Sequence, residues 1–133
     1  MMDALQQYLD SRRAVRFEWG VHDCACFAAG SVDARLGTEF VRAVKSYGVL
    51  SMRTYRKMLR TGRTLEALVT EVIGSPDLHA VDERTARGHI VLIGRGPAAA
   101  LAIAAPPVLL VAHEVGYRAV PMAAGTKVWR MEG

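Results

Sequence analysis

The chain has 133 residues, 51% of them hydrophobic and 23% charged, a composition typical of globular rather than disordered or fibrous proteins. Its length fits one domain, residues 1–133, large enough to bury a core without a disulfide or a metal. The formal net charge is +4, but seven basic residues and no acidic residue lie between Glu39 and Glu66. We therefore expect a basic face on that segment.

Two stretches resemble targeting or membrane segments only superficially. Residues 1–13 read as a polar amphipathic helix and lack the apolar centre of a signal peptide. Residues 97–112 form an apolar run of 16 residues, shorter than the roughly 20 of a membrane-spanning helix, and contain Pro106-Pro107. This run predicts two buried strands joined by a proline turn, in a soluble protein without a membrane span.

Apolar side chains recur at helical spacing in four segments of the first 74 residues. The predicted helices run from Asp3 to about Arg12, from Asp23 to Leu36, from Ser51 to Arg60 and from Thr64 to Ile73. Asp23, Ser51 and Thr64 are suited to cap their helices, and Gly37 is suited to end the second. We expect residues 14–19 to be extended and to bury their aromatic side chains. Residues 37–50 read as irregular because Gly48 breaks any continuous pattern.

After residue 87 the periodicity changes to that of strands. The predicted strands are His89 to Ile93, Ala100 to Ala104, Val108 to Ala112, Tyr117 to Met122 and Lys127 to Met131. Their short connections imply antiparallel pairing. The sequence therefore predicts an α+β fold, in which N-terminal helices pack on a C-terminal antiparallel sheet of about five strands.

Cys24 falls in the first turn of the second predicted helix. Unpaired backbone N–H groups and the positive end of the helix dipole favour a thiolate there, as at nucleophilic cysteines. The alternative is that Cys24 is a small buried apolar side chain, as most free cysteines are. Cys26 cannot form a normal disulfide with it inside one helix, because side chains two residues apart point to different faces.

Three short motifs resemble the NlpC-type branch of the papain-like cysteine peptidases, and more closely the small tail proteins of tailed phages related to it. Residues 19–24, Trp-Gly-Val-His-Asp-Cys, with Phe27 after them, resemble the Asp-Cys nucleophile motif at the start of a helix. Residues 87–93 resemble the Gly-Asp-hydrophobic strand that opens the sheet. Residues 101–103, Leu-Ala-Ile, resemble the end of the His-Val-Gly-Ile strand, and the last strand with Trp129 suits the phage branch.

The resemblance implies a cysteine that attacks an amide of the peptidoglycan stem peptide, a histidine that accepts its proton and a third polar residue that orients the histidine. By position, the cysteine is Cys24, the histidine position is Ala100 and the third position falls near His113. His89 stands where the family usually has Asp. Since Ala100 cannot move a proton, a base for Cys24 would have to come from His113 or His89.

We therefore expect a degenerate peptidase domain that serves as a structural component of a tailed-phage tail tip. The implied partners are other tail proteins, such as hub, distal tail or fibre proteins, and peptidoglycan. The implied location is the virion, after synthesis in the bacterial host cytoplasm. The alternative is an active cysteine peptidase or amidase that cleaves stem peptides during infection or tail assembly.

The residues also raise the possibilities of a zinc site and of nucleic-acid binding. The spacing of His22, Cys24 and Cys26 does not match that of structural zinc sites, and we expect neither a metal nor a cofactor. In residues 51–60, Met52, Tyr55, Met58 and Leu59 should face inward and the basic side chains outward. Nucleic-acid binding by that face is the weaker hypothesis, because no recognised motif accompanies it, whereas an acidic protein partner fits.

Overall fold

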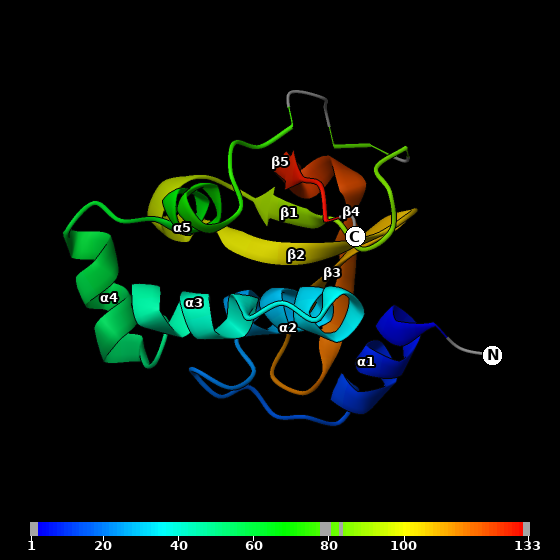
Figure 1. Ribbon diagram of the computed structural model, residues 1–133, viewed down its shortest axis with the longest axis horizontal. Coiled ribbons are helices and arrows are strands. Elements are labelled where there is room, and N and C mark those ends of the chain that lie inside the picture. The colour runs from blue at the N-terminus through cyan, green and yellow to red at the C-terminus, as the bar shows by residue number, and fades with distance from the viewer. Residues whose placement is uncertain (1–2, 78–80, 83, 132–133) are drawn as a thin grey trace.

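The structure is a computed structural model that describes residues 3–77, 81–82 and 84–131. Within these residues, helices come first along the chain and an antiparallel sheet follows (Figure 1). The helices are α1 (Ala4–Arg12), α2 (Cys24–Leu36), α3 (Phe40–Tyr47), α4 (Met52–Arg60) and α5 (Leu65–Val72). The strands are β1 (Ile90–Ile93), β2 (Ala100–Ala105), β3 (Val108–Ala112), β4 (Tyr117–Pro121) and β5 (Gly125–Trp129). The predicted α+β class is confirmed.

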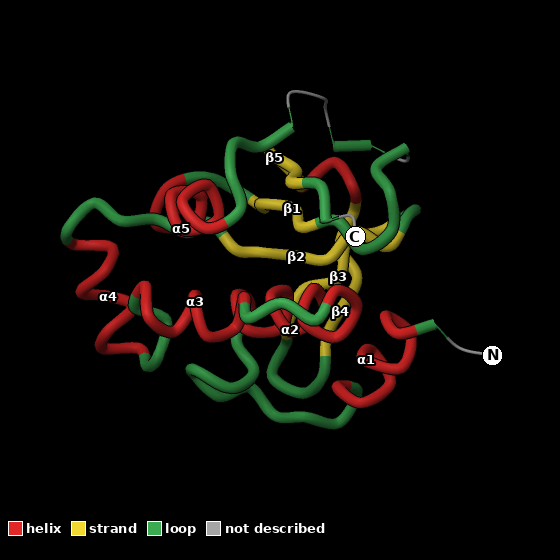
Figure 2. Tube along the Cα trace, in the orientation of Figure 1, coloured by secondary structure: helices red, strands yellow, loops and turns green. Residues whose placement is uncertain are grey.

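The sheet has the strand order β4-β3-β2-β1-β5, and all neighbouring strands are antiparallel. β2 and β3 are joined through Pro106-Pro107, as the proline turn predicts. The helix α2 packs on β2 and β3. Figure 2 shows α1 to α4 on one side of β2 and the strands β1 and β5 on the other. No helix of the described residues is long and apolar enough to cross a membrane.

The predicted helix caps are confirmed. The carboxylate of Asp23 accepts a hydrogen bond from the backbone of Cys26, and Gly37 ends α2 with a φ of +68°. Ser51 and Thr54 form a capping box at the start of α4, while the hydroxyl of Thr64 accepts from Ala67 at the start of α5. Local sequence therefore fixes where these three helices begin.

The prediction of an irregular segment over residues 37–50 is wrong, because α3 lies there. Phe40, Val44 and Tyr47 are buried along one face of this helix, and Gly48 ends it. Its own N-cap residue makes no side-chain cap. Instead, the carboxylate of Asp33 in α2 accepts from the backbone of Phe40 at 2.7 Å and from Val41 at 3.0 Å.

Three smaller predictions also differ from the structure. Phe17 and Met52 are exposed, by 39% and 48%, where both were expected to be buried. The segment of Phe17 lies on the edge of the fold, bonded to the backbone of Glu114, and Met52 is the first residue of α4, beyond the core. The last strand begins at Gly125 rather than at Lys127, because a short 3-10 helix, Met122–Ala124, turns the chain early.

The two faces of the sheet carry separate apolar clusters. Leu101 and Ile103 of β2 belong to the larger cluster, which includes the helices. Ala102 and Ala104 alternate with them and belong to a second cluster with side chains of β1, β3 and β5. Cys24 packs against both clusters, so the first turn of α2 lies where they meet.

Candidate functional site

Asp23 organises the chain around Cys24. Its two carboxylate oxygens accept hydrogen bonds from the backbone N–H groups of Cys26 and Gly20, both at 2.7 Å. The side chain of Asp23 is fully buried. It therefore ties the preceding loop to the first turn of α2 and fixes the position of Cys24 between them.

Burial raises the pKa of the Cys24 thiol to about 11. The backbone N–H of Leu101 in β2 donates to the sulfur and acts in the opposite direction, as do the N–H groups of Ala25 and Cys24 itself. The negative charge of Asp23 raises the pKa further. Desolvation outweighs these donors, so the raised pKa favours the alternative in which Cys24 is a small buried side chain. At neutral pH the Cys24 side chain is a thiol.

Ala100 and His113 lie at the end of the sheet that meets Cys24. Ala100 precedes Leu101, the donor to the sulfur, and packs against the second apolar cluster as Cys24 does. The pairing of β2 with β3 ends at Ile103 and Leu110; Ala100 begins β2 and His113 follows the last residue of β3, so both lie toward the same end of this hairpin. The side chain of His113 is exposed, and its backbone N–H donates to the carbonyl of Gly116 at 3.0 Å.

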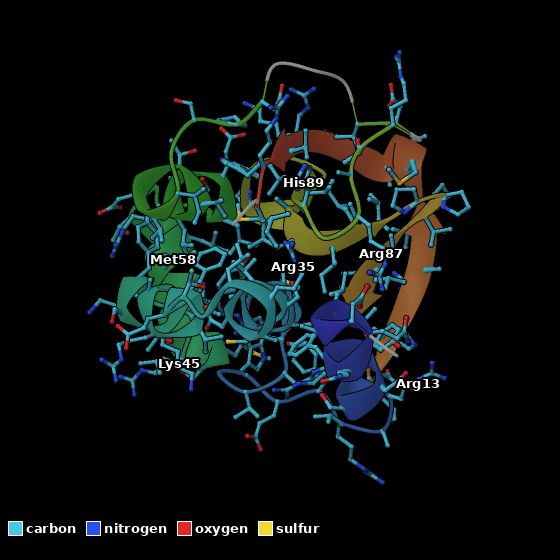
Figure 3. The ribbon with its side chains drawn as sticks, turned by 45° about the vertical axis from the view of Figure 1, so that its right-hand side comes forward. Arg13, Arg35, Lys45, Met58, Arg87 and His89 are labelled. Carbon is cyan, nitrogen blue, oxygen red and sulfur yellow. The ribbon has the colours of Figure 1, made fainter. Side chains whose placement is uncertain are left out.

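His89 lies at the opposite end of β2. Its carbonyl accepts from the backbone of Ala104, three residues beyond Leu101, which corresponds to about 10 Å along the strand. Its Nδ1 atom accepts from the N–H of Met131 at 3.1 Å. Figure 3 shows His89 close to Arg35, whose guanidinium donates to the carbonyls of Gly88 and Met131. His89 therefore holds the chain end against the sheet, and the structure does not bring it to Cys24.

His22 has a role that the sequence did not predict. Its ring is fully buried, its Nε2 atom lies 2.7 Å from the carbonyl oxygen of Gly116, and it meets the ring of Phe27 edge-on. Since a carbonyl only accepts, Nε2 carries the hydrogen. Its Nδ1 atom has no hydrogen-bond partner among the described residues. His22 therefore joins the start of α2 to the turn between β3 and β4, and nothing local in the sequence signals this.

Tyr55 is the other polar side chain near Cys24 that sequence reasoning treated only as core. Its ring lies 5.1 Å from that of Trp19, centre to centre. Burial raises the pKa of its phenol to about 12, and the charges of Cys24 and Asp23 raise it further. Trp19, Tyr55 and Cys24 all pack against the larger apolar cluster.

The remaining candidates form no further site within residues 3–77, 81–82 and 84–131. Cys24 and Cys26 are both free. No group of three histidine, cysteine, aspartate or glutamate side chains in that part of the chain could hold a metal ion. His79, for which we expected a surface position, lies outside the described residues.

One comparison with known proteins gives a match. The sequence model of a family described as "Domain of unknown function (DUF6950)" matches residues 1–131. No curated protein and no solved structure matches the chain.

Proposed function

We propose that this chain, which belongs to the family described as domain of unknown function DUF6950, is a structural component of a phage tail tip built on a degenerate cysteine-peptidase domain. The domain is of the papain-like, NlpC type. Its partners are other tail proteins, and its location is the virion. The peptidase chemistry has been lost, while the helix-on-sheet framework has been kept.

The observation that carries this proposal is the chemical state of Cys24. The thiol has a pKa raised to about 11 by burial and accepts from a backbone N–H of β2, and both Cys24 and Ala100 pack against the second apolar cluster. A cysteine nucleophile needs a base within hydrogen-bond reach or a lowered pKa. The pKa of Cys24 is raised rather than lowered, which supports a packing role for this residue.

Two further observations support the papain-like identity. The cysteine begins a helix that packs on an antiparallel sheet, in the chain order that the resemblance implies. Cys24 and Ala100, the positions assigned to the nucleophile and the histidine, both pack against the second apolar cluster.

Peptidase activity is tested with purified protein and stem peptides released from peptidoglycan. We expect no cleavage above that of the Cys24→Ala variant, with an active NlpC-type enzyme as the positive control. Cleavage that Cys24→Ala abolishes would contradict the loss of activity.

The structural role is tested by mass spectrometry of purified particles, in which the chain should be found together with the tail proteins. Its absence from the particles would contradict the virion location.

The alternative function is an active cysteine peptidase with His113 as the base. His113 is the candidate base because it directly follows β3, a strand on which α2 packs, and its side chain is exposed. This alternative predicts that His113→Gln slows alkylation of Cys24 by iodoacetamide at neutral pH. Equal alkylation rates of Cys24 in the unmodified protein and in the His113→Gln variant would exclude His113 as a base.

A further inference from the structure

The helices α3 and α4 carry a basic surface with two hollows. One, of about 670 Å³, is lined by residues of α4: Met52, Arg53, Arg56, Leu59 and Arg60. The other, of about 420 Å³, is lined by residues of α3 and the turn after it: Val41, Arg42, Lys45, Ser46 and Leu50. We call these ten residues the α3–α4 surface. In Figure 1 both helices extend to the end of the molecule away from α1, and Figure 3 shows Lys45 at the outer edge.

Most cations of this surface have no carboxylate partner within the described part of the chain. Arg42 pairs with Glu39, and both side chains are largely exposed. No described carboxylate pairs with Arg53, Arg56 or Arg60. Several unopposed positive charges on one short helix repel one another, so a bound anion or carboxylate would relieve that repulsion.

The apolar part of the surface is as unusual as its charge. Leu50, between α3 and α4, and Met52, the first residue of α4, are exposed by 52% and 48%, whereas Val44 and Met58 of the same helices are buried. Methionine and leucine beside guanidinium groups suit a partner that presents apolar side chains flanked by carboxylates. Arginine, with its planar fork, binds such carboxylates in pairs of hydrogen bonds.

We propose that the α3–α4 surface docks an acidic amphipathic helix of another protein. The larger hollow runs along α4, a helix of nine residues that is about 13 Å long. A bound helix suits a hollow of this length, because helices that bind in grooves contact them through apolar side chains one turn apart. Nucleic acid fits less well. Tyr55, the aromatic side chain of α4, is partly buried and packs on Trp19, so it is less suited to base stacking than an exposed ring. The proposal does not depend on whether Cys24 is reactive.

The test uses a fluorescein-labelled amphipathic peptide of Glu, Ala and Leu, with leucine on one helical face, and follows its binding to the full chain by fluorescence anisotropy. We expect binding that weakens with salt and falls at least about tenfold in the double variant Arg53→Glu and Arg56→Glu. The matched control is Arg16→Glu with Arg118→Glu, which makes the same change in net charge at exposed positions elsewhere. Met52→Ser should weaken binding without changing its salt dependence.

Four outcomes would overturn the proposal. The first is no binding of the peptide at millimolar concentration. The second is equal loss in the control pair, which would mean attraction by net charge alone. The third is tighter binding of duplex DNA than of the peptide. The fourth is concentration-dependent self-association that the Arg53 and Arg56 variant abolishes, which would identify a second copy as the occupant. None of these outcomes bears on stem-peptide cleavage, so the two proposals fail separately.

Discussion

At the scale of single residues, the site is organised by Asp23 more than by Cys24. The sequence predicts Asp23 as a helix cap, and the structure confirms it. The second bond of its carboxylate, to the N–H of Gly20, was not predicted, because it depends on how the loop closes. Asp23 is buried and accepts two hydrogen bonds, so its replacement should disturb the site most.

We expect Asp23→Ala to lower the free energy of unfolding by about 3 kcal/mol, since it removes a cap and leaves two buried N–H groups unpaired. Urea unfolding followed by circular dichroism measures the change. Asp23→Asn is the matched control and should lose less, because its amide oxygen still accepts one bond. Unchanged midpoints in both variants would show that the carboxylate does not hold the loop.

Ala100→His restores an imidazole at the position that the proposed ancestry requires. A cation beside the sulfur favours the thiolate, so the pKa of Cys24 should fall and its alkylation by iodoacetamide at neutral pH should become at least about tenfold faster. The labelled cysteine is identified by mass spectrometry. In the control variant Ala100→Gln, whose side chain is of similar size but is not a base, alkylation of Cys24 should stay slow. If both variants react alike, Ala100 does not face the thiol.

At the scale of elements, α3 was not predicted because its cap does not come from the residue directly before it. Its apolar positions, Phe40, Val44 and Tyr47, follow helical spacing, but its cap comes from Asp33, seven residues before its first turn. A search for a capping residue directly before the helix therefore fails. By contrast, α2, α4 and α5 begin at their own caps and were found.

Asp33→Ala should destabilise the protein by about 2 kcal/mol and reduce its helix content, because the N–H groups of Phe40 and Val41 lose their acceptor. Thr64→Ala, which removes a local cap with one bond, is the comparison and should cost about 1 kcal/mol. Both values come from urea unfolding. If Asp33→Ala lowers the free energy of unfolding by no more than Thr64→Ala does, then α3 needs no cap from α2.

At the scale of the whole molecule, alkaline pH should weaken the fold. Burial raises the pKa of Cys24 to about 11 and those of Cys26, Tyr8 and Tyr55 to about 12, above the ordinary values of 9.0 for cysteine and 10.0 for tyrosine. The unfolded chain therefore loses these protons at lower pH than the folded one. Their contribution to stability is full below about pH 9 and is lost as pH rises toward 12.

Thermal unfolding measured between neutral pH and about pH 11 should show this fall, and Cys24→Ala should make it shallower. The hydroxyl of Tyr8 donates to the carbonyl of Phe27 at 2.8 Å, so Tyr8→Phe lowers stability at neutral pH as well. A flat profile up to pH 11 in the unmodified protein would contradict the burial of these groups.

Much of this architecture could be predicted from sequence because it is local. Periodicity and turn residues gave helices before strands, the strand positions to within two residues at most ends, and the caps of α2, α4 and α5. The contacts that assemble the site join distant residues. His22 meets Gly116 across 94 positions, and Arg35 meets Met131 across 96, and no local pattern encodes either pair.

The measurement that tests this account most directly is the titration of the Cys24 thiol in the folded protein. Alkylation by iodoacetamide, assigned to Cys24 by mass spectrometry, is followed as a function of pH. We expect the rate to rise with a midpoint near pH 11 and to be unaffected by His113→Gln. A midpoint below about 7 that shifts upward in the His113→Gln variant would show an activated cysteine with a working base, and would contradict the account.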